Sequence, residues 1–357
     1  MTRTTAADKR QTVGSRLPRN QVRSTGLKVL LGVLILSIPF MTNPYYLSVI
    51  LLGAIYAIPV LGLYFITGLA GQLSLAEGAF FGVGAYTAAL LSTRFDVPFL
   101  GSVAAAALVG AAFGVLLGIP SLKLTSHYLA LVTIGFAVIT QIVLTEWSPV
   151  TGGTDGIGGI KPPAIGTYVL SNDFYYFYVV LAFLAPLAYI AYRVKRSRVG
   201  RAFLAIREDE LAASTSGINI MRYKVLAFTL STTFGAIGGA LYAHGLTRFI
   251  SPDFFNFDLS VAMLVMLLLG GQAAVPGAIL GAVVVTALPE ALRFLDRWYL
   301  VVYGVAVVLL VMFMPEGLWG RYESLRRRRW WRKTPRVDHG HQSTHTTPSE
   351  EPADVAQ

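Results

Sequence analysis

Residues 200–217 read Gly-Arg-Ala-Phe-Leu-Ala-Ile-Arg-Glu-Asp-Glu-Leu-Ala-Ala-Ser-Thr-Ser-Gly, a polar stretch between two long apolar runs, 174–192 and 223–243. Residues 201–216 are mostly good helix formers, and Gly217 stands where a left-handed glycine would end a helix. The stretch therefore predicts one helix of about four turns at a membrane surface. Its apolar residues form no single stripe, so we expect another protein, rather than lipid, to cover them. Taken alone, the stretch also fits a solvated connecting loop.

The composition places the apolar runs in a membrane. The chain has 357 residues, of which 54% are hydrophobic and 13% are charged. Runs of about twenty apolar residues can cross a bilayer as helices, in which every backbone group is satisfied within the segment. We predict an all-α, polytopic membrane protein with about ten transmembrane helices. The spans are expected at 27–42, 46–67, 77–93, 98–119, 127–146, 174–193, 223–245, 259–275, 277–295 and 299–314.

The basic residues orient these spans. With the predicted spans, all but five of the 29 lysines and arginines fall on one side of the membrane. The positive-inside rule makes that side cytoplasmic and places both termini there. The five exceptions are Arg94, Lys161, Arg248, Arg293 and Arg297. The net charge of +10 thus indicates contact with membrane lipids, and we expect no nucleic acid partner.

The domain organisation follows from these spans. We expect a disordered cytoplasmic segment at 1–26, a transmembrane domain at 27–320, and a tail at 321–357 that is first basic and then disordered. Within the domain, 200–217 is cytoplasmic and 147–173 is an external loop. The external loop is rich in glycine, which predicts backbone turns rather than a folded domain.

Glycine patterns indicate how the helices pack. Gly110, Gly114 and Gly118 repeat a four-residue spacing, which lets helices approach closely in lipid. The same spacing recurs at Gly78/Gly82, Gly235/Gly239 and Gly277/Gly281. General tolerance of glycine in membrane helices explains any one pair, whereas four occurrences favour a tightly packed bundle.

Two apolar segments are interrupted in a similar way, at 68–78 and at 269–277. Each contains Gly-Gln and then Gly-Ala-x-x-Gly at the start of a span. Irregular backbone at membrane depth persists only where protein buries it or a cavity adjoins it, and such breaks mark transport pathways. The alternative is a coincidence of helix-entry motifs.

Enzymatic and metal sites are not expected. The chain has no cysteine and no convergent set of nucleophile, base or metal ligands. The glycine-rich run at 151–159 lacks the Gly-Lys-Ser/Thr of a phosphate-binding loop. His339, His341 and His345 resemble a weak metal-binding tract, but we expect no metal there. An ion-coupled secondary transporter would need buried acids, and of the three acids nearest the spans, Glu77, Glu146 and Glu290, the first two are its plausible carriers.

Several motifs together resemble a known family. Residues 71–86, Gly-Gln-Leu-Ser-Leu-Ala-Glu-Gly-Ala-Phe-Phe-Gly-Val-Gly-Ala-Tyr, are similar to the signature of the branched-chain amino-acid ABC transporter permeases of the LivM type. Further similar motifs lie at 128–135, 151–153, 205–210, 217–219 and 270–271. The resemblance covers roughly residues 45–320. Many members carry Gly-His where this chain has Ala76-Glu77.

The resemblance implies the architecture and role of an ABC importer permease. Residues 200–217 resemble the cytoplasmic EAA-type segment that docks on an ATPase, with Leu211 inserted in the pattern. The chain lacks a Walker A motif, so it is expected to be a transport subunit without enzymatic activity and without a cofactor. The implied ATPase-coupling residues are Arg207, Glu208, Glu210, Ala212, Ala213 and Gly217. The expected translocation path includes Gln72, Ser74, Glu77, Tyr128, Thr133 and Gln272.

The resemblance also implies partners and a cargo. The expected partners are a LivH-like second permease, two cytoplasmic ATP-binding subunits and an extracytoplasmic solute-binding protein in the cell membrane of a prokaryote. The cargo would be leucine, isoleucine, valine or a related hydrophobic amino acid. Importers of urea or short amides have related permeases and remain alternatives.

Overall fold

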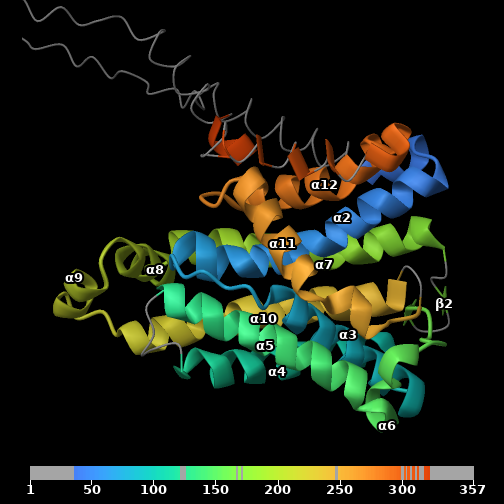
Figure 1. Ribbon diagram of the computed structural model, residues 1–357, viewed down its shortest axis with the longest axis horizontal. Coiled ribbons are helices and arrows are strands. Elements are labelled where there is room, and N and C mark those ends of the chain that lie inside the picture. The colour runs from blue at the N-terminus through green and yellow to red at the C-terminus, as the bar shows by residue number, and fades with distance from the viewer. Residues whose placement is uncertain are drawn as a thin grey trace, which may run out of the picture.

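The computed structural model describes residues 36–120, 126–165, 168–169, 172–245, 248–298 and part of 301–321. Its long helices lie side by side in one bundle, with α8 and α9 projecting at one end and α6 and β2 at the other (Figure 1). The helices are α2 Pro44–Leu63, α3 Glu77–Arg94, α4 Phe99–Gly118, α5 Ser126–Glu146, α6 Ser148–Thr151, α7 Asp173–Arg196, α8 Arg198–Glu208, α9 Glu210–Thr215, α10 Ile220–Gly245, α11 Phe257–Gly270 and α12 Val275–Ala291. A π-helical turn at Tyr64–Leu69 extends α2, and 3-10 turns occur at Gly153–Asp155, Pro252–Phe255 and Arg293–Trp298.

The fold confirms an all-helical membrane protein. In the described part of the chain, five helices are long and apolar enough to cross a bilayer: Pro44–Leu69, Phe99–Gly118, Tyr128–Glu146, Asp173–Arg196 and Ile220–Gly245. Shorter apolar helices, α11 and α12, accompany them. The segment at 1–26, most of the predicted spans at 27–42 and 299–314, and the tail from 322 lie outside the described residues. The count of ten spans therefore stays a prediction.

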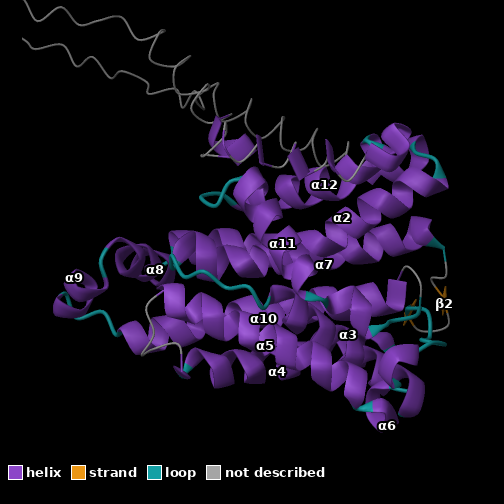
Figure 2. Ribbon diagram, viewed as in Figure 1, coloured by secondary structure: helices purple, strands orange, loops and turns teal. Residues whose placement is uncertain are grey.

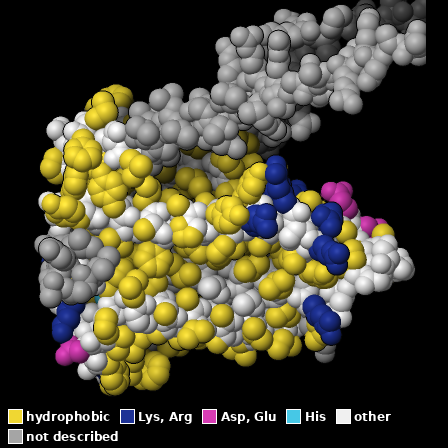
Figure 3. Space-filling model, turned by 180° about the vertical axis from the view of Figure 1, so that it is seen from behind, with side chains coloured by type: hydrophobic (Ala, Val, Ile, Leu, Met, Phe, Trp, Pro, Cys, Tyr) yellow, Lys and Arg dark blue, Asp and Glu magenta, His cyan; other side chains and the backbone are white. Residues whose placement is uncertain are grey.

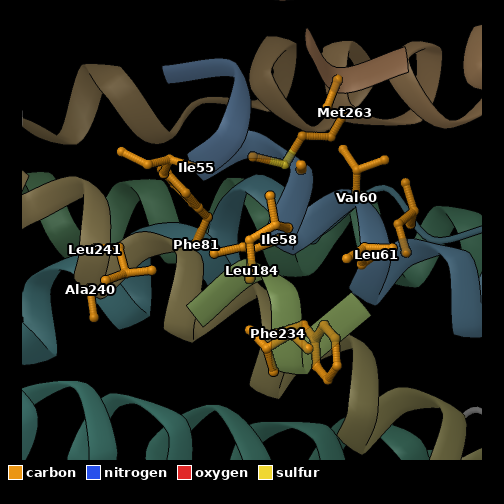
Figure 4. Packing of buried hydrophobic residues seen from close by; sticks show 14 of the residues in the cluster. Ile55, Ile58, Val60, Leu61, Phe81, Leu184, Phe234, Ala240, Leu241 and Met263 are labelled. Atoms are coloured by element: carbon orange, nitrogen blue, oxygen red, sulfur yellow. The ribbon is translucent and has the colours of Figure 1, made fainter. Parts of the chain in front are cut away.

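Helix α10 forms the centre of the bundle and packs against α2, α3 and α4. Figure 4 shows how Phe234 and Leu241 of α10 lie among apolar side chains of the other helices, including Ile58 of α2 and Phe81 of α3. All four side chains are at most 3% exposed. Because lipid supplies no hydrophobic drive between helices, close fitting of these side chains must hold the bundle together.

The predicted glycine contacts are confirmed. Gly110 and Gly114 of α4 face α10, where a Cβ on Gly114 would lie 2.3 Å from Thr232 Oγ1. Gly239 of α10 lies against the backbone of α3, and Gly281 of α12 lies against Met266 O of α11. Each glycine removes the side chain that would otherwise keep two helix backbones apart.

Basic residues gather at the end that carries α8 and α9, as Figure 3 shows, with a largely apolar surface beside them. In the described chain this end includes Arg193, Lys195, Arg196, Arg198, Arg201, Arg207, Arg222 and Lys224.

At the opposite end, the described part of the loop at 147–173 holds the short helix α6, the 3-10 turn at Gly153–Asp155 and a two-stranded hairpin of β1 Ala164–Ile165 and β2 Tyr168–Val169. Backbone bonds between Ile157 and Ile250 fasten it to the segment before α11. On α10, His244 is hydrogen-bonded through Nδ1 to Lys161 O and through Nε2 to Ser102 Oγ. The loop is therefore fixed to the bundle.

Candidate functional site

The polar stretch at 200–217 forms two helices and not one. Helix α8 ends at Glu208, Asp209 adopts an extended conformation with φ −159° and ψ 114°, and α9 begins at Glu210. Asp209 Oδ1 accepts hydrogen bonds from the backbone N–H groups of Leu211 and Ala212 at 2.8 and 3.0 Å. The prediction of a single four-turn helix is therefore wrong, because the side chain of Asp209 makes a better N-cap than a helix-interior residue.

Gly217 ends α9 as the sequence predicts. Its φ is +80°, in the left-handed region. The Gly217 N–H donates to Ser214 O at 3.0 Å, and the Ile218 N–H donates to Ala213 O at 3.1 Å. These two bonds form a Schellman motif, which satisfies carbonyl groups at the end of α9. We call α8 and α9 together the arm.

One face of the arm packs on the bundle and another is open. Ala202, Phe203 and Ile206 of α8 and Ala213 of α9 are at most 6% exposed. The expected coupling residues Glu208, Ala212 and Gly217 are exposed, and Leu211 beside them is 75% exposed. The arm is thus anchored through α8, while α9 presents an apolar side chain and small residues to its surroundings.

Glu210 is turned back toward the chain itself. Its Oε1 lies 2.6 Å from Lys224 Nζ at the start of α10. The Lys224 side chain is 1% exposed, whereas the Glu210 side chain is 50% exposed. A buried ammonium needs a partner of opposite charge, so this ion pair fixes α9 against α10.

The first break begins in the π-helical turn at Tyr64–Leu69 and continues as irregular backbone to α3. In Figure 2 this loop runs from the arm into the bundle. Other helices supply hydrogen bonds to its backbone: Leu75 N–H donates to Thr133 Oγ1 of α5 at 3.1 Å, and Gly78 N–H donates to Ser260 Oγ of α11 at 2.9 Å. Much of the irregular backbone is thus enclosed by protein that bonds to it, as membrane depth requires, although Gly71 is exposed.

The second break is the turn between α11 and α12, residues 271–274, and it meets the first. A Cβ on Gly68 would lie 2.6 Å from the carbonyl oxygen of Gln272. Two interruptions about two hundred residues apart in sequence are therefore neighbours in space. The sequence identified both breaks, but it gave no signal that they touch.

Arg207 joins the arm to the first break. Its Nη1 donates to Gly68 O at 2.6 Å. Its side chain also lies over Gly71, where an added Cβ would come 2.6 Å from Arg207 Cγ. Gly71 has φ +70°, so both its backbone conformation and its surroundings favour glycine. The resemblance implied an ATPase-coupling role for Arg207, and the structure adds that its guanidinium bonds within the chain.

The expected path residues fall into two groups. Gln72, Ser74, Glu77 and Thr133 are at most 3% exposed, whereas Tyr128 is 63% exposed and Gln272 is intermediate. Glu77 Oε2 accepts a hydrogen bond from Ser231 Oγ at 2.9 Å. Among the described residues, Glu77 Oε1 and Gln72 Oε1 have no hydrogen-bond partner. In this conformation, polar groups of the first break are enclosed between α3, α5 and α10.

A family comparison matches residues 45–313 to the permease component of the branched-chain amino acid transport system. The chain belongs to this permease family. It is therefore a membrane-spanning transport subunit of an ABC system and not itself an enzyme.

The relatives agree with this family. The permease is 34% identical over 313 residues to the high-affinity branched-chain amino acid transport permease LivM of Escherichia coli, covering 81% of this chain and 73% of the relative. It is 27% identical to the LivH permease of the same organism, over 76% of this chain and 93% of the relative. It is also 26% identical to the ribose import permease RbsC of Haemophilus influenzae, over 81% and 91%. No solved structure matches the chain significantly.

Sequence reasoning missed several residues of this region of the permease. Lys195 donates to Ala273 O in the second break. Lys224 pairs with Glu210, Ser231 donates to Glu77, and Ser260 accepts from the Gly78 N–H. Only Asp209 carried a usable signal, since aspartate is a preferred N-cap residue and a modest helix former. The other pairings depend on how distant helices pack, which no local pattern encodes.

Proposed function

We propose that the arm is the cytoplasmic docking element for an ATP-binding subunit, and that the two helix breaks adjoin the path of a branched-chain amino acid. The observation that supports this most is the exposed Leu211 on α9, held out from the bundle between the Asp209 cap and the Gly217 motif. An exposed apolar residue on a short, well-capped helix suits a groove on a partner protein. The basic residues around the arm support its cytoplasmic placement.

The proposed assembly pairs this permease with a second, LivH-like permease, two ATP-binding subunits and an extracytoplasmic solute-binding protein. Similarity to both LivM and LivH of one organism supports a paired arrangement. The decisive experiment is co-purification of the permease with a tagged ATP-binding subunit encoded with it, with uptake of labelled leucine in reconstituted vesicles. Absence of any stable association would contradict the proposal, and uptake of urea in place of leucine would favour the alternative cargo.

Replacing Gly217 should weaken docking without preventing insertion. A Cβ at Gly217 would meet no atom within 4 Å, so Gly217→Val adds no clash, but valine in the left-handed conformation costs about 1–2 kcal/mol. We expect normal amounts of protein in the membrane and roughly tenfold weaker association with the ATP-binding subunit, measured by titration in detergent. Gly217→Asn is the matched control, because asparagine tolerates this conformation and should bind almost normally. Equal binding by both variants and the native chain would show that the end of α9 plays no part in docking.

The enclosed side chains of the first break should become accessible during transport. In this conformation single cysteines at positions 72, 74 and 77 would be shielded, since the native residues are at most 3% exposed. A cysteine at Thr154, an exposed residue of the loop between α6 and α7, provides the accessible control. We expect small water-soluble thiol reagents to label position 154 always, and positions 72 and 74 in only some nucleotide states of the complex. Shielding of 72, 74 and 77 in every state would show that the break is permanent interior.

A further inference from the structure

The junction between α7 and α8 is a tightly packed elbow. Ser197 Oγ donates to Val194 O at 2.7 Å and accepts the Val199 N–H at 3.1 Å, so it caps both helices. A Cβ on Gly200 would lie 2.4 Å from the carbonyl oxygens of Val194 and Lys195, so the backbone of α8 packs directly against the end of α7 at this glycine. The last turn of α7 and helix α8 should therefore move as one unit.

Each side of the elbow reaches one of the two helix breaks. From the end of α7, Lys195 Nζ donates to Ala273 O in the second break. From α8, Arg207 Nη1 donates to Gly68 O in the first break. Carbonyl groups near helix ends carry partial negative charge and lack intrahelical partners, so cationic donors suit them well.

The two breaks bound by this elbow also contact each other, through Gly68 and the carbonyl of Gln272. One rigid element is thus bonded to two interrupted segments that already touch. A helix bundle changes conformation most easily where irregular backbone joins its helices, because such backbone has few local hydrogen bonds to hold its shape. A displacement of α8 would act first at these two bonds.

We propose that Arg207, together with Lys195, is a positioning residue that transmits movement of the arm to the two helix breaks. The inference rests on the proposed docking of the arm, but it assigns Arg207 a different task from docking. The Arg207 guanidinium bonds to the permease itself. The aliphatic part of the Arg207 side chain lies so close to Gly71 that a Cβ at position 71 would clash with it. Arg207 is at the same time an exposed residue of the arm, so the bond to Gly68 lies where a partner can shift it.

The test measures labelled leucine taken up per ATP hydrolysed by the complete complex in vesicles, alongside co-purification of the ATP-binding subunit. In Arg207→Gln we expect unchanged subunit association and continued ATP hydrolysis, with uptake per ATP lowered roughly threefold to thirtyfold. Arg207→Lys keeps a cationic donor and should recover part of the loss. Arg201→Gln is the matched control, since Arg201 is an exposed arginine of α8 whose Nη1 makes a long 3.5 Å contact with Arg196 O at the end of α7 and reaches neither break.

Two outcomes would overturn the proposal. If Arg207→Gln takes up as much leucine per ATP as Arg201→Gln does, the bond from Arg207 to Gly68 does not transmit movement of the arm. Loss of the ATP-binding subunit in Arg207→Gln would instead make Arg207 a docking residue. Should this variant fail to accumulate, the same ratio is measured in Lys195→Gln, which removes the other bond, and a native ratio there overturns the proposal. Failure of the native chain to bind the ATP-binding subunit would contradict the proposed function instead, so the two failures are distinguishable.

Discussion

Gly239→Ala is expected to prevent the permease from folding into its native bundle. A Cβ at this position of α10 would lie 1.8 Å from Phe81 O and 2.8 Å from Ala85 N on α3. Both atoms belong to helix backbone, so no side-chain rotation can relieve the contact and the two helices must separate. Overpacking in a core costs about 1–3 kcal/mol and sometimes more, and a contact between backbones belongs at the upper end.

The measurement is the yield of monodisperse permease after mild detergent extraction, together with its thermal unfolding midpoint. Gly135→Ala provides the matched control, because a Cβ on this glycine of α5 would meet no atom within 4 Å. We expect native yield from Gly135→Ala and little or none from Gly239→Ala. Native yield and stability in Gly239→Ala would mean that α3 and α10 lie farther apart than the structure places them.

The same glycines show what the sequence could predict. The spacing of Gly235/Gly239 and Gly110/Gly114 indicated close helix contacts, and the structure places both pairs at α10. Composition and residue spacing suffice to predict membrane helices and their close contacts. In lipid the backbone must satisfy its own hydrogen bonds, and only small residues let two helices approach closely. Helix ends set by one residue, such as Gly217, are predictable for the same reason.

Contacts between distant segments were not predictable from the sequence. The bond from Arg207 to Gly68 joins residues 139 positions apart and depends on where α8 lies relative to α2. The break at Asp209 was missed for a different reason. Neighbouring helix formers favour one continuous helix, while the side chain of Asp209 gains two hydrogen bonds by interrupting it. At Asp209 the helix propensity of the neighbouring residues favours a continuous helix, but the N-cap hydrogen bonds of its side chain favour a break, and the structure has the break.

The ion pair between Glu210 and Lys224 provides the second prediction with a large effect. Resemblance to the EAA-type segment implies that Glu210 faces the ATP-binding subunit, whereas the structure pairs it with Lys224. If the internal pair is its main role, Glu210→Lys leaves the buried ammonium of Lys224 beside a second positive charge. Removing one partner of a buried pair costs about 3–5 kcal/mol, and the half-exposed Glu210 places this pair toward the lower figure. We expect α9 to detach and transport to fall to background.

The two partners should respond unequally, because only one of them is buried. Lys224→Met replaces a 1%-exposed ammonium by an apolar side chain of similar length and leaves Glu210 able to face water. We expect this variant to keep most of the binding to the ATP-binding subunit, while Glu210→Lys loses it. The double exchange, Glu210→Lys with Lys224→Glu, restores an opposite pair and should recover binding in part. A basic groove on the ATP-binding subunit that required Glu210 would give the contrary result, since the double exchange would then bind no better than Glu210→Lys alone.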